Sequence, residues 1–140
     1  MDIAALIAWV ITALGGFVLL GTWIQHGGLK QQQSGGSRLP APVVFGHFLL
    51  AAAGLVVWII YVVTVTTALA WVAFVLLVVI ALLGFTMFTR WLPVRRGAAA
   101  AGGEVPAEKH LPVPVVGAHG VFAVATVVLV LLTALGVGGS

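Results

Sequence analysis

Cysteine is absent from this chain of 140 residues, and charged residues are scarce. Without cysteine, the chain has no disulfides, no thiolate metal ligands and no thiol catalysis. Only 6% of its residues are charged, against about 25% in soluble domains. In contrast, 62% are hydrophobic and the mean hydropathy is +1.25. This balance excludes an ordinary soluble domain and favours a protein embedded in lipid.

Four apolar stretches are long enough to cross a membrane, which takes about 20 apolar residues per helix. They cover residues 3–24, 43–65, 68–89 and 115–137. Backbone groups in lipid must satisfy their own hydrogen bonds, so stretches of this length are predicted to be helical. The sequence therefore predicts an all-α integral membrane protein, a four-helix bundle that forms a single transmembrane domain over residues 1–140.

The basic residues predict how the helices are oriented. All of them fall in the two longer connections, 25–42 and 90–114, and none lies at a terminus or in the 65–67 turn. Cytoplasmic loops carry such an excess, so we expect both loops in the cytoplasm and both termini outside a bacterial inner (plasma) membrane. The net charge of +3 and the pI near 10.3 then reflect these loops and not a nucleic-acid surface. Both connections are rich in small or polar residues and are expected to have no fold of their own.

The sequence contains an internal repeat. The pattern L-P-x-P-V-V-x-x-H occurs at 39–47 and again at 111–119. The first and third apolar stretches also align, with these residues at equivalent positions: Ala5 and Ala73, Gly16 and Gly84, Trp23 and Trp91. Each repeat, 1–67 and 68–140, holds two helices, an even number, so both copies have the same orientation. We therefore expect a duplicated two-helix hairpin with a pseudo-twofold axis along the membrane normal.

Two histidines are the only ionisable residues besides Tyr61 inside the apolar stretches. His47 and His119 both end the repeated pattern, about four residues into their helices and so roughly 6 Å deep. An ionisable residue in a span is a functional-site hypothesis by default. Haem iron takes an imidazole on each face, and helix bundles hold cofactors between facing side chains. We therefore predict one haem b ligated by His47 and His119 near the cytoplasmic face.

Four further residues are predicted to contact this cofactor. Gly16 and Gly84, at equivalent positions, would let the edge of the porphyrin approach the helix backbone. Arg38 and Arg90, at the predicted cytoplasmic side, would supply cations for charge-assisted hydrogen bonds to the haem propionates.

Other interpretations of the histidine pair stay open: a divalent metal, contact with a quinone headgroup, or a purely structural role. A transition-metal site usually needs a third or fourth ligand, and no Asp, Glu or third His lies at that depth. His26 and His110 have no symmetric partner and are expected to lie at the membrane interface. The same location, in two interfacial belts, is expected for the tryptophans, Trp9, Trp58 and Trp71 at one end and Trp23 and Trp91 at the other.

The chain resembles the small membrane-bound b-type cytochromes, in which four helices hold haem between histidines on the second and fourth. It is also similar to small four-helix membrane proteins of high-GC Gram-positive bacteria, which often end in a helix that reads like His119-Gly120 followed by residues 129–136. The resemblance implies haem and iron binding and a part in electron transport. Only one histidine pair has matching depth, so a relay through two haems is not expected.

The first functional hypothesis is therefore a membrane electron-transfer protein, a non-catalytic carrier or accessory subunit that exchanges electrons with a larger respiratory complex or with quinone. The alternative is a cofactor-free accessory or assembly subunit of a larger membrane complex. A small transporter is a second alternative, because many carriers contain such repeats. Ion-coupled carriers usually bury an acidic residue near the midplane, whereas Asp2, Glu104 and Glu108 all lie outside the spans.

Overall fold

The computed structural model describes residues 1–99 and 101–138 and contains no strand in these ranges. Its long helices are α1 (Asp2–Gln25), α3 (Ala41–Thr64), α4 (Thr67–Arg95) and α5 (Val113–Ala134). Each is long and apolar enough to cross a membrane. The prediction of an all-α chain with four candidate spans is confirmed.

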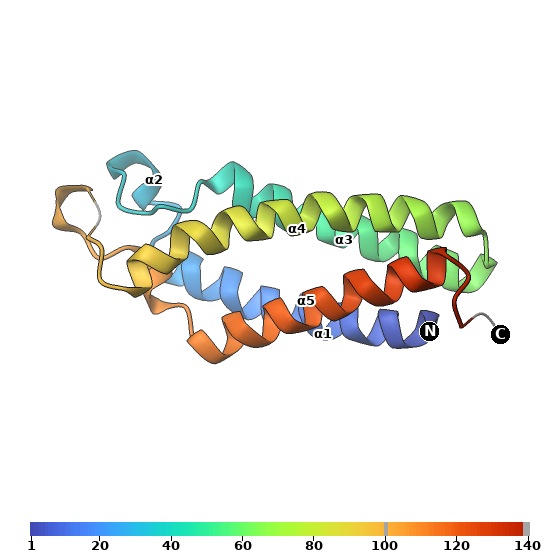
Figure 1. The fold of residues 1–140 in the computed structure, drawn as a ribbon. Helices are drawn as coiled ribbons and strands as arrows, with labels where there is room; N and C mark the ends of the chain where they lie inside the picture. The colour runs from blue at the N-terminus through green and yellow to red at the C-terminus, as the bar shows by residue number, and fades with distance from the viewer. Residues whose placement is uncertain (100, 139–140) are drawn as a thin grey trace.

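The four long helices form an up-down-up-down bundle (Figure 1). Helices α1 and α4 each pack against both α3 and α5. Consequently α3 and α5, which carry the two histidines, lie diagonally opposite each other. The start of α1 and the end of α5 lie at one end of the bundle. The short helices α2 (Gln31–Ser34) and η2 (Ala107–His110), which belong to the two longer connections, lie at the other.

The ends of the helices follow from local chemistry. Pro40 and Pro112 are the N-caps of α3 and α5, and a second proline follows within the first turn of each helix, where a missing N–H group costs nothing. Helix α4 continues to Arg95, past its expected end at 89. In its last turns, the buried side chains of Trp91 and Val94 pack against the bundle. Tertiary contacts therefore stabilise these turns, and a hydropathy pattern does not indicate such contacts.

Two separate hydrophobic clusters make up the core. The one near the termini contains Trp9, Trp58 and Tyr61, and the one near the loops contains Trp23 and Trp91. These four tryptophans are buried inside the bundle, so the prediction that they form interfacial belts is wrong. The indole N–H groups of Trp23, Trp58 and Trp91 donate hydrogen bonds within the protein, for example Trp23 to the Ser37 hydroxyl at 3.1 Å. Trp71, at 40% exposure, is the one tryptophan that faces outward.

The two longer connections fold onto each other, contrary to the expectation that they lack structure. Glu108 in η2 is fully buried between them. Its carboxylate accepts hydrogen bonds from the backbone N–H of Arg38 and from the hydroxyl of Ser37, the latter at 2.9 Å. The Trp91 indole N–H donates to the backbone carbonyl of Glu108 at 3.1 Å. Glu108 thus joins both loops to the end of α4.

Replacing Glu108 with alanine is expected to destabilise the protein by about 2–4 kcal/mol, because two hydrogen-bond donors lose their acceptor inside the loop layer. Glu108→Gln retains one carbonyl acceptor and is expected to lose less. Denaturation of the purified protein in detergent measures both effects. The matched control is Glu104→Ala, which removes an exposed acid that accepts a hydrogen bond from Ser34 in the same loop layer. An equal loss of stability in the two alanine variants would contradict the role given to Glu108.

Candidate functional site

The two histidines of the repeated pattern face each other across the bundle. The ring centres of His47 on α3 and His119 on α5 are 6.2 Å apart, and the ring planes make an angle of 56°. Because α3 begins at Ala41 and α5 at Val113, each histidine lies six residues into its helix, roughly 9 Å along the axis. The structure therefore brings together the pair that the sequence predicts, at equal depth and somewhat deeper than expected.

Each imidazole is held by a backbone carbonyl of the neighbouring helix. His47 Nδ1 lies 2.9 Å from the Ile80 oxygen in α4, and His119 Nδ1 lies 2.8 Å from the Thr12 oxygen in α1. A carbonyl only accepts, so Nδ1 of each ring must carry the proton. In a neutral imidazole this leaves Nε2 with a free lone pair, the tautomer that binds metals through Nε2. Thr12 and Ile80 occupy equivalent positions in the alignment of the repeats.

Glycine makes these hydrogen bonds possible. A helical carbonyl points toward the residue four positions later, which is Gly16 for Thr12 and Gly84 for Ile80. A Cβ on Gly16 would stand 3.2 Å from Cε1 of His119, and a Cβ on Gly84 would stand 3.1 Å from Cε1 of His47. Even an alanine here would require the ring to shift slightly, and a bulky side chain would push the ring away from its carbonyl. The predicted glycines do adjoin the histidines.

The close packing of the core is interrupted at this level. None of the described residues in 10–22, 45–53, 81–90 or 112–125 is buried, although the clusters on both sides of this layer contain fully buried side chains. The four stretches surround His47 and His119 in the bundle. The layer of the bundle that contains His47 and His119 is thus the least buried part of the interior.

An apolar groove of about 380 Å³ opens beside His119, between α1 and α5. Among the residues that line this groove, His119 is the only one with a polar side chain. The groove lies on the outer face of the bundle, because its lining residue Leu14 is 60% exposed. In the other repeat, Leu83 Cδ1 comes within 4.0 Å of where a Cβ on Gly46 would stand. Gly15 occupies the position equivalent to Leu83. Because glycine has no side chain to cover the groove, His119 is open to the outer face of the bundle.

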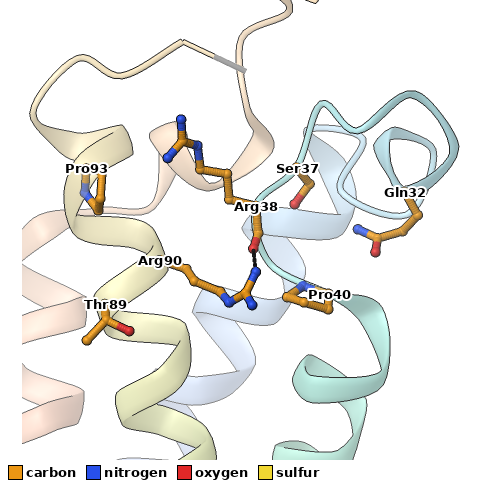
Figure 2. Close-up of a pocket in the computed structure, with 7 residues that line it drawn as sticks. All are labelled: Gln32, Ser37, Arg38, Pro40, Thr89, Arg90 and Pro93. Atoms are coloured by element: carbon orange, nitrogen blue, oxygen red, sulfur yellow. Dashed lines mark hydrogen bonds between the residues drawn. The ribbon is translucent and has the colours of Figure 1, made fainter. Parts of the chain in front are cut away.

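The two predicted arginines lie together, but in a pocket of their own. Arg38 and Arg90 line a cavity of about 430 Å³ between the start of α3 and the end of α4 (Figure 2). Neither His47 nor Gly84 lines this cavity. The contact of these arginines with haem propionates stays a prediction.

The structure contains a second histidine pair that the sequence does not predict. The rings of His26 and His110 stack with their centres 4.0 Å apart and an interplanar angle of 12°. Both residues are exposed at the loop end of the bundle. Only the folding of η2 onto the end of α1 brings them together, and no spacing in the sequence indicates that contact.

Across residues 1–99 and 101–138, no group of three or more His, Cys, Asp or Glu side chains is placed to hold a metal ion. A site with two histidines is therefore judged on its own geometry. Comparisons of the chain with protein-family models, with curated proteins and with solved structures found no match.

Proposed function

We propose that this protein is a membrane electron-transfer protein that holds one haem b between His47 and His119. The observation that carries the proposal is the spacing of the two rings. A metal–imidazole bond is about 2 Å long and a ring nitrogen lies about 1 Å from its ring centre, so two rings that grip one metal from opposite sides have centres about 6 Å apart. The measured separation is 6.2 Å.

The protonation of the rings supports the same assignment. A histidine that ligates a metal usually donates its other ring N–H to a carbonyl or carboxylate, which fixes the tautomer and the orientation of the ring. In both His47 and His119, Nδ1 donates such a hydrogen bond to a backbone carbonyl. Two such rings satisfy haem iron, whose remaining ligands come from the porphyrin, whereas Zn²⁺ would need further protein ligands.

The surroundings of the pair also suit a flat cofactor. The small residues Gly16 and Gly84 flank the rings, and the core packing is interrupted at their level. Held by His47 and His119, a haem would supply reversible one-electron transfer. The protein's part is to hold the two rings in position and to surround the site with apolar helices. The groove beside His119 then gives a membrane-borne partner, a quinone or a larger redox complex, its approach to the ligand pair.

We further infer that the bundle arose by duplication of a helix hairpin. Equivalent residues make equivalent contacts: His47 with Ile80 and Gly84, and His119 with Thr12 and Gly16. The pairing of α1 with α5 likewise corresponds to the pairing of α4 with α3. Such matched contacts are what a pseudo-twofold axis along the bundle would produce.

The absorption spectrum of the protein, purified in detergent and reduced with dithionite, tests the proposal directly. We expect a b-type haem spectrum with about one haem per chain. A colourless protein that copurifies with a large membrane complex would instead support the alternative, a cofactor-free accessory or assembly subunit. Haem supplementation during expression ensures that a colourless preparation reflects the protein and not the supply of haem.

The orientation of the helices gives a separate prediction. The six basic residues lie at the loop end, which we place in the cytoplasm with both termini outside. Because the chain has no cysteine, a single engineered cysteine reports its own side of the membrane. Gln33→Cys in the first loop should react with a membrane-impermeant maleimide only in inverted bacterial vesicles, and Thr66→Cys in the α3–α4 turn only in intact cells or spheroplasts. The opposite labelling pattern would contradict this orientation.

A further inference from the structure

The arginine pocket lies where two of the candidate spans meet the loop end. Thr89 and Arg90 belong to the last turns of α4, and Pro40 caps the start of α3 (Figure 2). The cavity between them measures about 430 Å³ and is open on one side. In a bundle whose helices cross a bilayer, this level coincides with the headgroups of the adjacent leaflet.

The walls of the pocket are fixed by hydrogen bonds within the protein. The Gln32 side chain donates to the backbone oxygens of Gly28 and Leu39 and accepts from the N–H of Ala41. Ser37 is engaged by Trp23 and Glu108. These polar groups are already satisfied, so they shape the cavity and leave ligand binding to the arginines.

The two guanidinium groups retain most of their capacity to donate. Arg38 donates to the Ala99 oxygen at 3.1 Å, and Arg90 to the Arg38 backbone oxygen at 3.4 Å. Each uses one of its five N–H groups on a neutral acceptor. Within the part of the chain that the structure describes, neither forms a salt bridge, and no acid lines the cavity. Both arginines line one pocket. Two positive charges there favour an anion with several acceptor oxygens.

We propose that this pocket binds the phosphate of an anionic phospholipid headgroup. Phosphate oxygens match the fork of each guanidinium. A headgroup with net negative charge is favoured over a zwitterionic one, because the pocket holds no acid to pair with an ammonium group. The site occurs once per chain: the positions equivalent to Arg38 and Arg90 in the other repeat are His110 and Thr22. The proposal does not require that the protein binds haem.

Native mass spectrometry of the protein in mixed micelles of phosphatidylcholine and phosphatidylglycerol tests this site. We expect the wild type to retain one phosphatidylglycerol in preference to phosphatidylcholine. Arg38→Gln and Arg90→Gln should each weaken that retention roughly fivefold or more. Arg95→Gln removes the same charge at the C-terminal end of α4, outside the pocket, and should retain the lipid as the wild type does.

Three results would overturn the assignment. Equal loss of lipid in Arg90→Gln and Arg95→Gln would reveal attraction by overall charge without a site. Displacement of the lipid by millimolar inorganic phosphate would identify a site for soluble phosphate. Loss of a haem band in Arg38→Gln and Arg90→Gln, but not in Arg95→Gln, would assign the pocket to haem propionates instead. If the wild type carries no haem, the lipid measurement still decides the question, so the two proposals fail separately.

Discussion

Alanine in place of either His47 or His119 is expected to lower the haem content of the purified protein about tenfold or more. Each ring would supply one of the two protein ligands of the proposed site, and no other His, Asp or Glu of the described residues lies at that level. The reduced absorption spectrum measures the loss, and thermal denaturation of the same samples shows whether the bundle remains folded. A b-type band that survives in both variants would rule out the ligand pair.

The other two histidines provide the matched controls. His26 and His110 are also within contact distance of each other, with ring centres 4.0 Å apart. Parallel stacking prevents them from binding one metal through ring nitrogens, because such bonds lie in the plane of each imidazole. His26→Ala and His110→Ala should therefore keep the haem spectrum of the wild type. Addition of free imidazole to His119→Gly offers a further check, since recovery of the spectrum would show that the missing group is the ligand and not a structural contact.

The sequence predicts the helices well because the hydropathy of a span depends only on the residues within that span. The expected spans begin within a turn of the observed ones, and prolines mark the starts of α3 and α5. The histidine pair is predictable for a related reason: both residues end the same repeated pattern, so similar helices must place them at the same depth. That the two rings also face each other is a result of the structure.

The loop end could not be predicted because its contacts join distant parts of the chain. Glu108 meets Ser37 and Arg38 across the two connections, and each partner alone resembles an exposed loop residue. The predicted location of the tryptophans was wrong for a different reason. A tryptophan near the end of an apolar helix suits an interfacial position as well as a buried one, and only the neighbouring helices decide between them. Trp23 and Trp91 find acceptors in the folded loops and are buried beneath them.

Leucine at Gly16 or Gly84 is expected to have the second large effect, even though neither glycine is a ligand. The new side chain would occupy the space of the imidazole, since a Cβ alone comes within 3.2 Å of His119 or 3.1 Å of His47. The ring would have to leave its carbonyl, which removes the hydrogen bond that fixes the tautomer and the direction of Nε2. Loss of such a supporting contact typically weakens metal binding about 10- to 100-fold. Haem retained per chain after dilution measures this change.

Gly21→Leu is the matched control, because it adds the same side chain to the same helix at a position where a Cβ meets nothing within 4 Å. It should keep both haem and stability. Gly16→Leu should lower the thermal stability of the protein even without haem, because Thr12 then loses its contact with His119. Unchanged haem retention in Gly16→Leu and Gly84→Leu would show that the carbonyl contacts do not position the ligands. A loss confined to these two variants, together with the lower stability of haem-free Gly16→Leu, would support the role of the glycines as positioning residues that act through the histidines.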